Sequence, residues 1–431
     1  MRKKILTAVV IASALVLAAC SSGSPGGSTS SGDSPITLTL WHNYGTEQNA
    51  VATDALTKAY SELHPNVTFK VVSQPGDNYF ALLQASAISK TGPDLAVMWT
   101  GLFTLKYKNL LVNLKDKVPA ADLAKVEGLN WMSDGFDAKN GPYVMPLEQQ
   151  FYIGFYNKEA FKDAGIAQVP TTWDELNASC TALKAAGYTP LVYGNGGQSL
   201  GATFYPWYDL SYLMIGAHSV DQWADLASSK IPWNSAENVS QLTKWAALKA
   251  SGCTNSDVLT KTDNLDDFTS GKAAMIIDGT WDTDKFTTAM KDNVAAFVPP
   301  FSDSPIKGVV EYPGDGFAIT TYSKHQDEAA KFLTFLTSDQ AAKIIDGAGL
   351  ISAVTGKATS NPVNQQMLDF AAKQGFVRFP MLDNVIQGDV VDVGGKVLPS
   401  ILSGNISPKD GLAQFAQAWK QLPADQKDPM K

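Results

Sequence analysis

The chain has 431 residues, of which 34 are Lys or Arg and 42 are Asp or Glu, so its formal net charge at pH 7 is -8. A body with this charge and without a run of basic residues repels phosphate groups, which excludes nucleic-acid binding. The length exceeds what one hydrophobic core usually serves, and we therefore expect two domains.

The first residues have the pattern of a secretion signal. Three basic side chains precede an apolar run over residues 5–17, which is too short to be a permanent membrane anchor. Small residues follow and end at Cys20, an order that resembles the signal of bacterial lipoproteins, in which the peptide is cut before a cysteine that carries a lipid. The resemblance implies a signal peptide over residues 1–19 and a lipidated Cys20.

The next segment, up to residue 35, consists almost entirely of Ser, Gly, Thr and Pro. Such a composition cannot bury apolar surface, so we expect residues 20–35 to be the lipidated cysteine and a flexible linker. No later apolar run approaches the length of a transmembrane helix. We therefore expect the protein to meet the membrane through its lipid anchor only.

From residue 36 onward, short strands alternate with amphipathic helices. Residues 36–41 form a β-branched run, residues 46–63 carry apolar side chains at helical spacing, and residues 67–73 return to a strand pattern. A β-α-β unit of this kind predicts a parallel sheet, and its repetition predicts the α/β class.

Polar and aromatic residues follow two of the expected strands. His42, Asn43 and Tyr44 lie on the loop after the first strand, and Trp99 ends the strand expected over residues 95–99. Open α/β sheets bind their ligands at the carboxyl ends of strands. We therefore expect these four side chains to contact a ligand.

A later segment places an aromatic residue and an acid at the end of a buried strand. Residues 273–277 form a short apolar run, which predicts a strand covered on both faces, and Thr280 is placed to cap the helix that follows. Trp281 and Asp282 thus fall at the carboxyl edge of a sheet. We expect both to contact a ligand; the alternative is that Trp281 packs in the core.

This segment contains the phrase F-x-x-G-K-A-A-M-x-x-x-G-x-W, which resembles family 1 extracellular solute-binding proteins, the substrate-capturing subunits of ABC importers for sugars. Three further phrases are similar to that family, namely S-x-T-G-P-D-L-x-x-x-W, Y-N-K-x-x-F and P-x-T-W-D-E-L. The resemblance covers nearly the whole chain after residue 35. In maltose-binding proteins the aromatic residue that ends the first phrase packs on a sugar ring, which implies that role for Trp281. A tryptophan just after the strand of the second phrase also packs on the ligand there, which implies the same role for Trp99, although Trp99 stands one residue out of step with that pattern.

The resemblance implies an α/β fold of two lobes, like that of periplasmic binding proteins, with a hinge and a ligand cleft between the lobes. Lobe 1 would comprise residues 36–149 and 310–347. Lobe 2 would comprise residues 150–309 and 348–431.

Four further residues are candidates for ligand binding, of which Glu148 and Gln149 come from the resemblance. Glu148 and Gln149 lie where the chain first crosses between the lobes, a segment that the family uses for ligand hydroxyls, although ordinary surface exposure is the alternative for each. Asp315 stands at the second crossing, where the family frequently has Gly or Ser, and brings a carboxylate to the hinge side of the cleft. Trp207 follows a glycine-rich stretch that we expect to rim the cleft; its alternative is a place in the core.

Two cysteines remain besides Cys20. Cys180 and Cys253 form an even pair in an oxidising compartment, and both fall in segments assigned to lobe 2. They form either a disulfide or two buried free thiols.

One motif favours a different class of function. Residues 197–201 match G-x-S-x-G, with Ser199 in the position of a nucleophile, but that turn needs its serine directly after a strand, and here glycines intervene. The 4 histidines show no metal-binding spacing, and the sequence contains no phosphate-binding loop motif. We therefore expect no enzyme activity and no cofactor, with a secreted hydrolase that uses Ser199 as the alternative.

Together, these patterns predict a monomeric lipoprotein on the outer face of the cell membrane, which captures a carbohydrate and delivers it to the permease subunits of an ABC transporter. Its 10 tryptophans and 14 tyrosines suit sugars, because aromatic rings pack on the CH faces of sugar rings. The alternative ligand is another small polar solute such as a polyamine, which would require more convergent carboxylates than the motifs supply.

Overall fold

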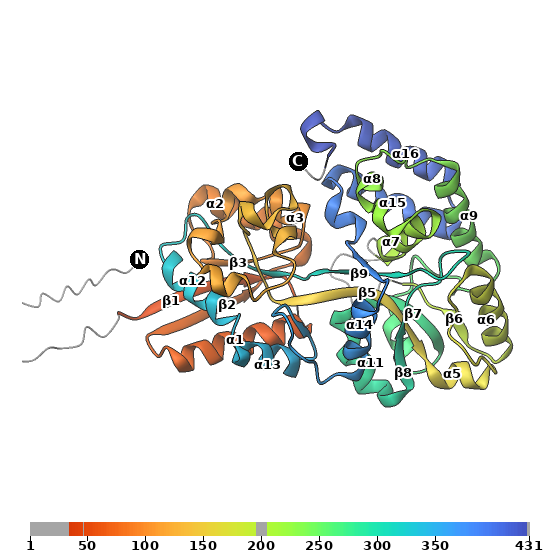
Figure 1. The fold of residues 1–431 in the computed structure, drawn as a ribbon, viewed down its shortest axis with the longest axis horizontal. Coiled ribbons are helices and arrows are strands. Elements are labelled where there is room, and N and C mark those ends of the chain that lie inside the picture. Colours follow the sequence, from red (N-terminus) through yellow and green to blue (C-terminus); the bar gives the residue numbers. More distant parts are fainter. Residues whose placement is uncertain (1–33, 46, 195–204, 429–431) are drawn as a thin grey trace, which may run out of the picture. The chain divides into compact units, whose positions relative to one another are not determined.

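The computed structural model describes residues 34–45, 47–194 and 205–428. The expected signal peptide, Cys20, most of the linker and Ser199 lie outside these residues. In the described part, helices cover two β-sheets, so the expected α/β class is confirmed (Figure 1). None of the helices there combines the length and the apolar character needed to span a bilayer.

The strands are short except for β5. Their bounds are β1 Ile36–His42, β2 Val67–Ser73, β3 Leu95–Met98, β4 Met145–Pro146, β5 Glu148–Asn157, β6 Thr189–Leu191, β7 Ala273–Gly279, β8 Val294–Phe297, β9 Gly308–Pro313, β10 Gly316–Ile319, β11 Ile351–Ser352 and β12 Val377–Phe379.

The helices begin and end as follows: α1 Gln48–Leu63, α2 Tyr79–Ser89, α3 Leu102–Leu105, α4 Ala120–Leu123, α5 Lys158–Asp163, α6 Trp173–Ala185, α7 Tyr205–Ala217, α8 Trp223–Ala227, α9 Ala236–Ala250, α10 Asn264–Thr269, α11 Thr283–Met290, α12 Gln326–Phe335, α13 Asp339–Gly347, α14 Pro362–Ala372, α15 Gly388–Ser403 and α16 Pro408–Gln421.

The first sheet has the strand order β2-β1-β3-β10-β4. β1 pairs in parallel with β2 and β3, as the β-α-β pattern predicts, whereas β10 runs antiparallel to β3 and β4. Alternate side chains of β3 point to opposite faces, so Leu95 and Val97 join the core with α1, α12 and α13, while Ala96 and Met98 join a smaller core with α2. Burial on both faces explains why this strand is apolar throughout.

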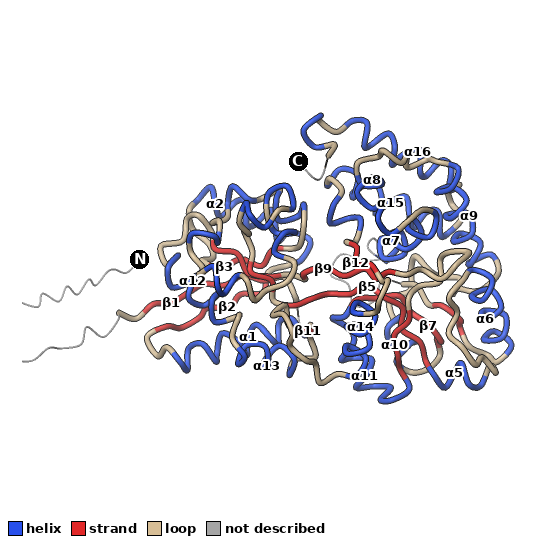
Figure 2. The backbone as a smooth tube through the Cα atoms, in the orientation of Figure 1, coloured by secondary structure: helices blue, strands red, loops and turns tan. Residues whose placement is uncertain are grey.

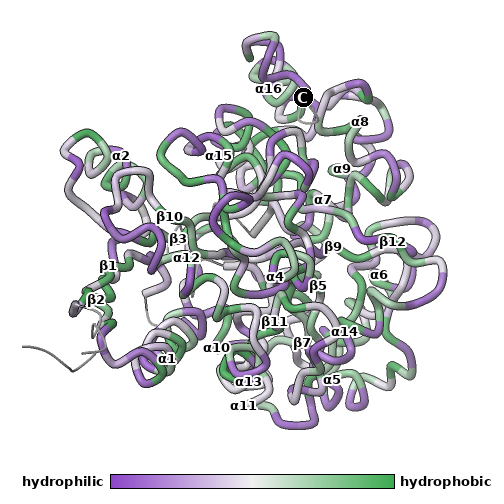
Figure 3. The backbone as a smooth tube through the Cα atoms, turned by 60° about the vertical axis from the view of Figure 1, so that its left-hand side comes forward, coloured by the Kyte–Doolittle hydropathy of each residue, from purple (hydrophilic) through white to green (hydrophobic). Residues whose placement is uncertain are grey.

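The second sheet is organised around β5, with the order β12-β9-β5-β7-β6 and with β8 and β11 also paired to β5. Helices α7, α9 and α15 contribute to the core on one face, and α11 and α14 contribute to the core on the other. Hydrophilic and hydrophobic stretches alternate along most of the covering helices (Figure 3), because a helix on the surface buries one face only. Helix α7 is an exception, since its residues 207–215 are all buried.

Two segments that join the sheets lie side by side. The chain passes from β4 in the first sheet to β5 in the second, and it returns from β9 to β10. Leu147 N donates to Asp315 O at 2.9 Å, and Gly314 N donates to Glu148 O at 2.7 Å. The strands β5 and β9 that these segments enter are neighbours in the second sheet (Figure 2).

Candidate ligand-binding site

A pocket of about 120 Å³ lies where the loops after β1 and β3 face the second sheet. Its walls come from segments far apart in the sequence, because strand ends of both sheets and the joining segment meet there. The lining residues are Asn43, Tyr44, Glu47, Asn49, Trp99, Thr100, Phe103, Gln150, Tyr152, Tyr208, Trp281, Tyr312, Asp315, Asp383 and Asn384. Five of the ten expected ligand-binding residues are among them.

Four aromatic rings form one wall. Tyr152 on β5 lies at the centre: its ring is stacked on Tyr312 with centroids 5.3 Å apart, and it meets Tyr208 at 4.2 Å and Trp281 at 5.1 Å. A Cβ atom on Gly279 would lie 2.0 Å from the Trp281 indole, so only glycine at this position lets the ring fold back over the end of β7. Trp281 is therefore held at the strand end, as its position in the sequence predicts.

A second aromatic group lies on the side of the first sheet. Trp99 contacts Phe103 and Phe80 edge to face, with centroids 5.2 and 4.9 Å apart, and Phe80 is stacked on Tyr107. Trp99 and Phe103 also line a neighbouring cavity of about 240 Å³. The loop that carries Trp99 contains Gly101, where a Cβ atom would lie 2.1 Å from the backbone oxygen of Asn384. This close approach brings the turn at Asp383 to the pocket.

The loop after β1 presents two polar side chains. Asn43 and Tyr44 are almost fully buried at 6% and 5% exposure, and both line the pocket. Asn43 Oδ1 and Tyr44 OH have no hydrogen-bond partner among the described residues. His42 does not line the pocket. Its Nδ1 accepts from the Tyr44 backbone N at 3.2 Å, and burial lowers its pKa, so the ring positions the loop.

Glu148 lies one layer behind the pocket. Its Oε1 accepts from the amides of Asn49 and Gln150, the latter at 2.8 Å, and both amides belong to the pocket wall. Burial raises the pKa of Glu148 to about 7. Gln150 in turn accepts from Tyr312 OH at 2.9 Å, so Glu148 supports the wall through its neighbours.

Gln149 points the other way. Adjacent residues of a strand face opposite sides of the sheet, and its amide donates to Glu127 Oε2 at 2.8 Å. It is therefore not brought to the pocket.

Three acidic side chains line the pocket from separate segments: Glu47 before α1, Asp315 between β9 and β10, and Asp383 in the turn before α15. Burial and the nearby carboxyl groups of Asp282 and Glu148 raise the pKa of Glu47 to about 8, and burial raises the pKa of Asp383 to about 8. Burial, and then the carboxyl groups of Glu148 and Glu47, hold the pKa of Asp315 well above its ordinary value.

Asp282 lines a larger adjoining cavity of about 1030 Å³, which shares Asn43, Tyr44, Glu47 and Trp281 with the pocket. Burial raises the pKa of Asp282 to about 6. In the part of the chain that the structure describes, no group of three or more His, Cys, Asp or Glu side chains is arranged to hold a metal ion.

The sequence matches the bacterial extracellular solute-binding protein family over residues 44–343. The chain belongs to this family. Its members bind solutes and are not enzymes, which agrees with the expectation from the sequence.

Relatives of this solute-binding protein cover nearly its whole length. It is 24% identical to an uncharacterized ABC transporter extracellular-binding protein of Pyrococcus horikoshii, over 100% of this chain and 95% of that one. It is 25% identical to the sn-glycerol-3-phosphate-binding periplasmic protein UgpB of Salmonella typhimurium, over 90% of this chain and 92% of that one.

The fold also matches solved structures. A chitin oligosaccharide binding protein aligns with a TM-score of 0.77 and 20% identity, over 89% of this chain and 98% of that one. This similarity confirms the expected two-lobed, periplasmic-binding-protein-like fold.

One expected site residue of this solute-binding protein lies in the core instead. Trp207 is 0% exposed, its ring lies 5.6 Å from that of Phe415, and a Cβ atom on Gly394 would lie 2.0 Å from its Cζ2. Successive residues of an α-helix point about 100° apart. Tyr208, the next residue of α7, therefore reaches the pocket while Trp207 faces away from it.

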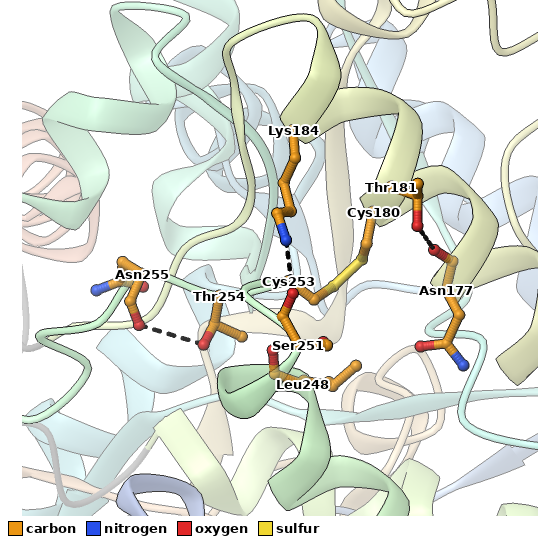
Figure 4. The surroundings of a disulfide bond; sticks show 9 residues. All are labelled: Asn177, Cys180, Thr181, Lys184, Leu248, Ser251, Cys253, Thr254 and Asn255. Carbon is orange, nitrogen blue, oxygen red and sulfur yellow. Dashed lines mark hydrogen bonds between the residues drawn. A yellow bond between two sulfur atoms is a disulfide. The ribbon is translucent and has the colours of Figure 1, made fainter.

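Cys180 on α6 and Cys253 after α9 form a disulfide in the structure, with Cα atoms 5.1 Å apart (Figure 4). Beside it, Lys184 Nζ donates to the backbone oxygen of Ser251 at 2.6 Å, which also joins the two segments. The bond lies in the core of the second sheet, and neither cysteine lines the pocket.

Several pocket residues were not predicted from the sequence: Glu47, Asn49, Thr100, Phe103, Gln150, Tyr152, Tyr312, Asp383 and Asn384. The sequence does contain a signal for Gln150 and Tyr152. Both follow the crossing directly, and as alternate residues of β5 they lie on the same face of the sheet. No local pattern marks Asp383, whose place depends on the contact of its turn with the loop at Gly101.

Proposed function

We propose that this protein is an extracellular, monomeric substrate-binding lipoprotein that captures a carbohydrate in this pocket and delivers it to the permease of an ABC transporter. The observation that carries the proposal is a wall of four aromatic rings in the same pocket as buried amide, hydroxyl and carboxyl groups. Sugar rings need this combination, since their CH faces pack on aromatic rings while their hydroxyls need donors and acceptors.

The neighbouring cavities support a ligand longer than one sugar unit. The cavity of about 240 Å³ shares Trp99 and Phe103 with the pocket, and the cavity of about 1030 Å³ shares Trp281 with it. An oligosaccharide centred on the pocket would extend past an aromatic side chain in either direction. The solved relative that binds chitin oligosaccharides has a ligand of this chemical class.

We assign lobe 1 to residues 36–149 and 310–347 and lobe 2 to residues 150–309 and 348–431. The sheets support this division, because β1, β3 and β10 fall in the first set while β7 and β12 fall in the second. β9 spans the boundary, since its pairing with β5 continues to Pro313. Closure of the lobes about the two joining segments would enclose the ligand, as in other hinged binding proteins.

The anchor is proposed from the sequence of the N-terminus. A lipid on Cys20 would hold the protein on the outer face of the membrane, near its permease. Native protein should then partition into detergent, and Cys20→Ala should release it or block its processing. An unmodified mature form that starts at another residue would contradict this.

A panel of mono- and oligosaccharides tests the function. Purified protein should melt at a higher temperature with a bound sugar and leave that sugar intact. Release of shorter products would favour the hydrolase alternative with Ser199, and failure of every sugar to shift the melt would overturn carbohydrate capture.

A polyamine remains a second candidate because Glu47, Asp315 and Asp383 line one pocket. Spermidine in the same panel separates the two classes, since a linear amine has no sugar ring to pack on the aromatic wall. A shift with spermidine and with no sugar would replace the carbohydrate proposal.

A further inference from the structure

The ionisable side chains that the structure describes in the pocket include acids but no bases. Three of its lining residues are acids, and none of the described residues that line it is Lys, Arg or His. Glu148 adds a fourth carboxyl group directly behind the wall, where Asn49 and Gln150 hold it. An anionic ligand would find no cationic partner among the described residues that line this pocket.

The unpaired groups of the pocket are mostly acceptors. Asn43 Oδ1, Asn49 Oδ1 and Asp383 Oδ1 are buried without a hydrogen-bond partner in the described part of the chain, against one amide donor, Asn384 Nδ2, and the hydroxyl of Tyr44. Each of these residues is less than one-tenth exposed. A ligand that satisfies them must bring more donors than acceptors.

An ammonium group has this property. It carries three N–H donors and no acceptor, whereas a hydroxyl carries one donor and two acceptor lone pairs. The aromatic wall adds a second attraction, because Tyr152, Tyr208, Trp281 and Tyr312 pack on one another and all line the pocket, so a cation in it can lie against their rings.

We infer that the carbohydrate is an amino sugar, whose protonated amine lies among Glu47, Asp315 and Asp383 and against the aromatic wall. The inference rests on the proposed carbohydrate function and names its substrate class. The raised pKa values of Glu47, Asp315 and Asp383 agree with it, since an empty pocket keeps protons on its acids and a bound cation replaces them.

Matched ligands test the inference. The β-1,4-linked disaccharide of glucosamine and its N-acetylated counterpart have the same rings and linkage, but only the first carries protonated amines. Calorimetry at pH 6 should give at least tenfold tighter binding of the amine form. Binding should also release protons, which is seen as a dependence of the measured heat on the ionisation enthalpy of the buffer.

Variants sharpen the test. Asp383→Asn and Glu47→Gln should each reduce the ratio between the two affinities by at least fivefold, with a smaller effect on the N-acetylated ligand. Glu62→Gln, an exposed acid on α1, is the control and should leave the ratio unchanged. An apo melt of each variant establishes that it folds.

Each outcome decides between the proposals. Equal or tighter binding of the N-acetylated disaccharide, or of cellobiose, would overturn the amino-sugar inference and leave carbohydrate capture intact. Binding of spermidine or choline with no sugar bound would overturn both. Binding of sn-glycerol 3-phosphate at comparable affinity would also overturn the inference, because the described lining residues offer no cationic side chain to that anion.

Discussion

Helix α7 contributes to two aromatic clusters that differ in their surroundings. In the core cluster, Trp207 and Trp233 are both 0% exposed and pack on Phe415 at 5.6 and 5.4 Å. In the pocket cluster, Tyr208 meets Tyr152 at 4.2 Å beside a space of about 120 Å³. The same helix therefore supports both packing and a ligand site at adjacent positions.

The difference teaches that aromatic residue type does not identify a sugar-binding residue. Trp207 faces close-packed helices, where α15 has Gly394 to make room for the indole. Trp281 stands at the end of β7 and lines the pocket with Asn43, Asp383 and Asn384, each of which has a buried polar atom without a hydrogen-bond partner among the described residues. Position at a strand end, together with polar neighbours, distinguishes a tryptophan that is expected to contact ligand from one that packs in the core.

The largest expected effect is on the core cluster. Trp207→Ala should lower the free energy of unfolding by about 3–5 kcal/mol, because it leaves a cavity that the helices around it cannot close. Denaturant unfolding of the apo protein measures this. Ligand affinity of the remaining folded protein should stay unchanged, and a loss of affinity at full stability would remove the distinction between the clusters.

The disulfide should affect stability alone. Its cysteines are 73 residues apart, and closure of a loop of this length contributes about 4 kcal/mol in the entropic description. The Cys180→Ala/Cys253→Ala double variant should therefore unfold at lower denaturant concentration and bind ligand as before. Intact masses after alkylation without reduction check the bond, and two alkylated thiols in native protein would rule it out.

The sequence predicts those parts of the fold and site that are local. The run over residues 273–277 predicts β7, and the break after it predicts that Trp281 stands at the strand end, where the pocket is found. Likewise, Asn43 and Tyr44 follow β1, and both line the pocket.

Residues whose position depends on distant contacts could not be predicted in this way. Tyr152 and Tyr312 face the pocket because β5 and β9 pair in one register, with Tyr152 opposite Val310 and Gln150 opposite Tyr312. A shift of one residue would turn these side chains to the other face. The same alternation explains why only Glu148, of the two neighbouring candidates, supports the pocket wall.

The pocket region also differs from the core cluster in containing buried carboxyl groups, which should make the free energy of unfolding depend on pH. The pKa of Glu148 is raised by burial from 4.5 to about 7, so between these values the folded protein retains a proton that the unfolded chain has released. The free energy of unfolding should therefore fall as pH rises, by about 3 kcal/mol from this group between pH 5 and pH 8.

Glu148→Gln removes this ionisation and keeps the shape of the side chain. The unfolding free energy of the variant should depend less on pH than that of the parent, measured by denaturant titrations across the range. The Glu148 carboxyl also raises the pKa values of Glu47 and Asp315, so the variant should lower their contributions to the pH dependence as well. Parallel pH profiles would show that Glu148 is not buried in the way the structure describes.

The smallest effect, and the most direct test of the pocket cluster, concerns Trp281. The indole lies at the edge of the pocket and is partly exposed, so Trp281→Ala should leave the melting temperature of the apo protein nearly unchanged. Ligand affinity should fall by roughly 10- to 100-fold, since each factor of ten corresponds to about 1.4 kcal/mol and a central aromatic contact is often worth one or two such factors.

Calorimetry with a sugar that binds the parent protein, together with an apo melt of each variant, measures both quantities. Trp281→Phe should recover much of the affinity, because a smaller ring can still pack on Tyr152 and on the ligand. If Trp281→Ala instead lowers apo stability as much as Trp207→Ala and leaves affinity unchanged, then Trp281 belongs with the core cluster. Trp99, which also lines the pocket, would then be the better aromatic candidate for ligand contact.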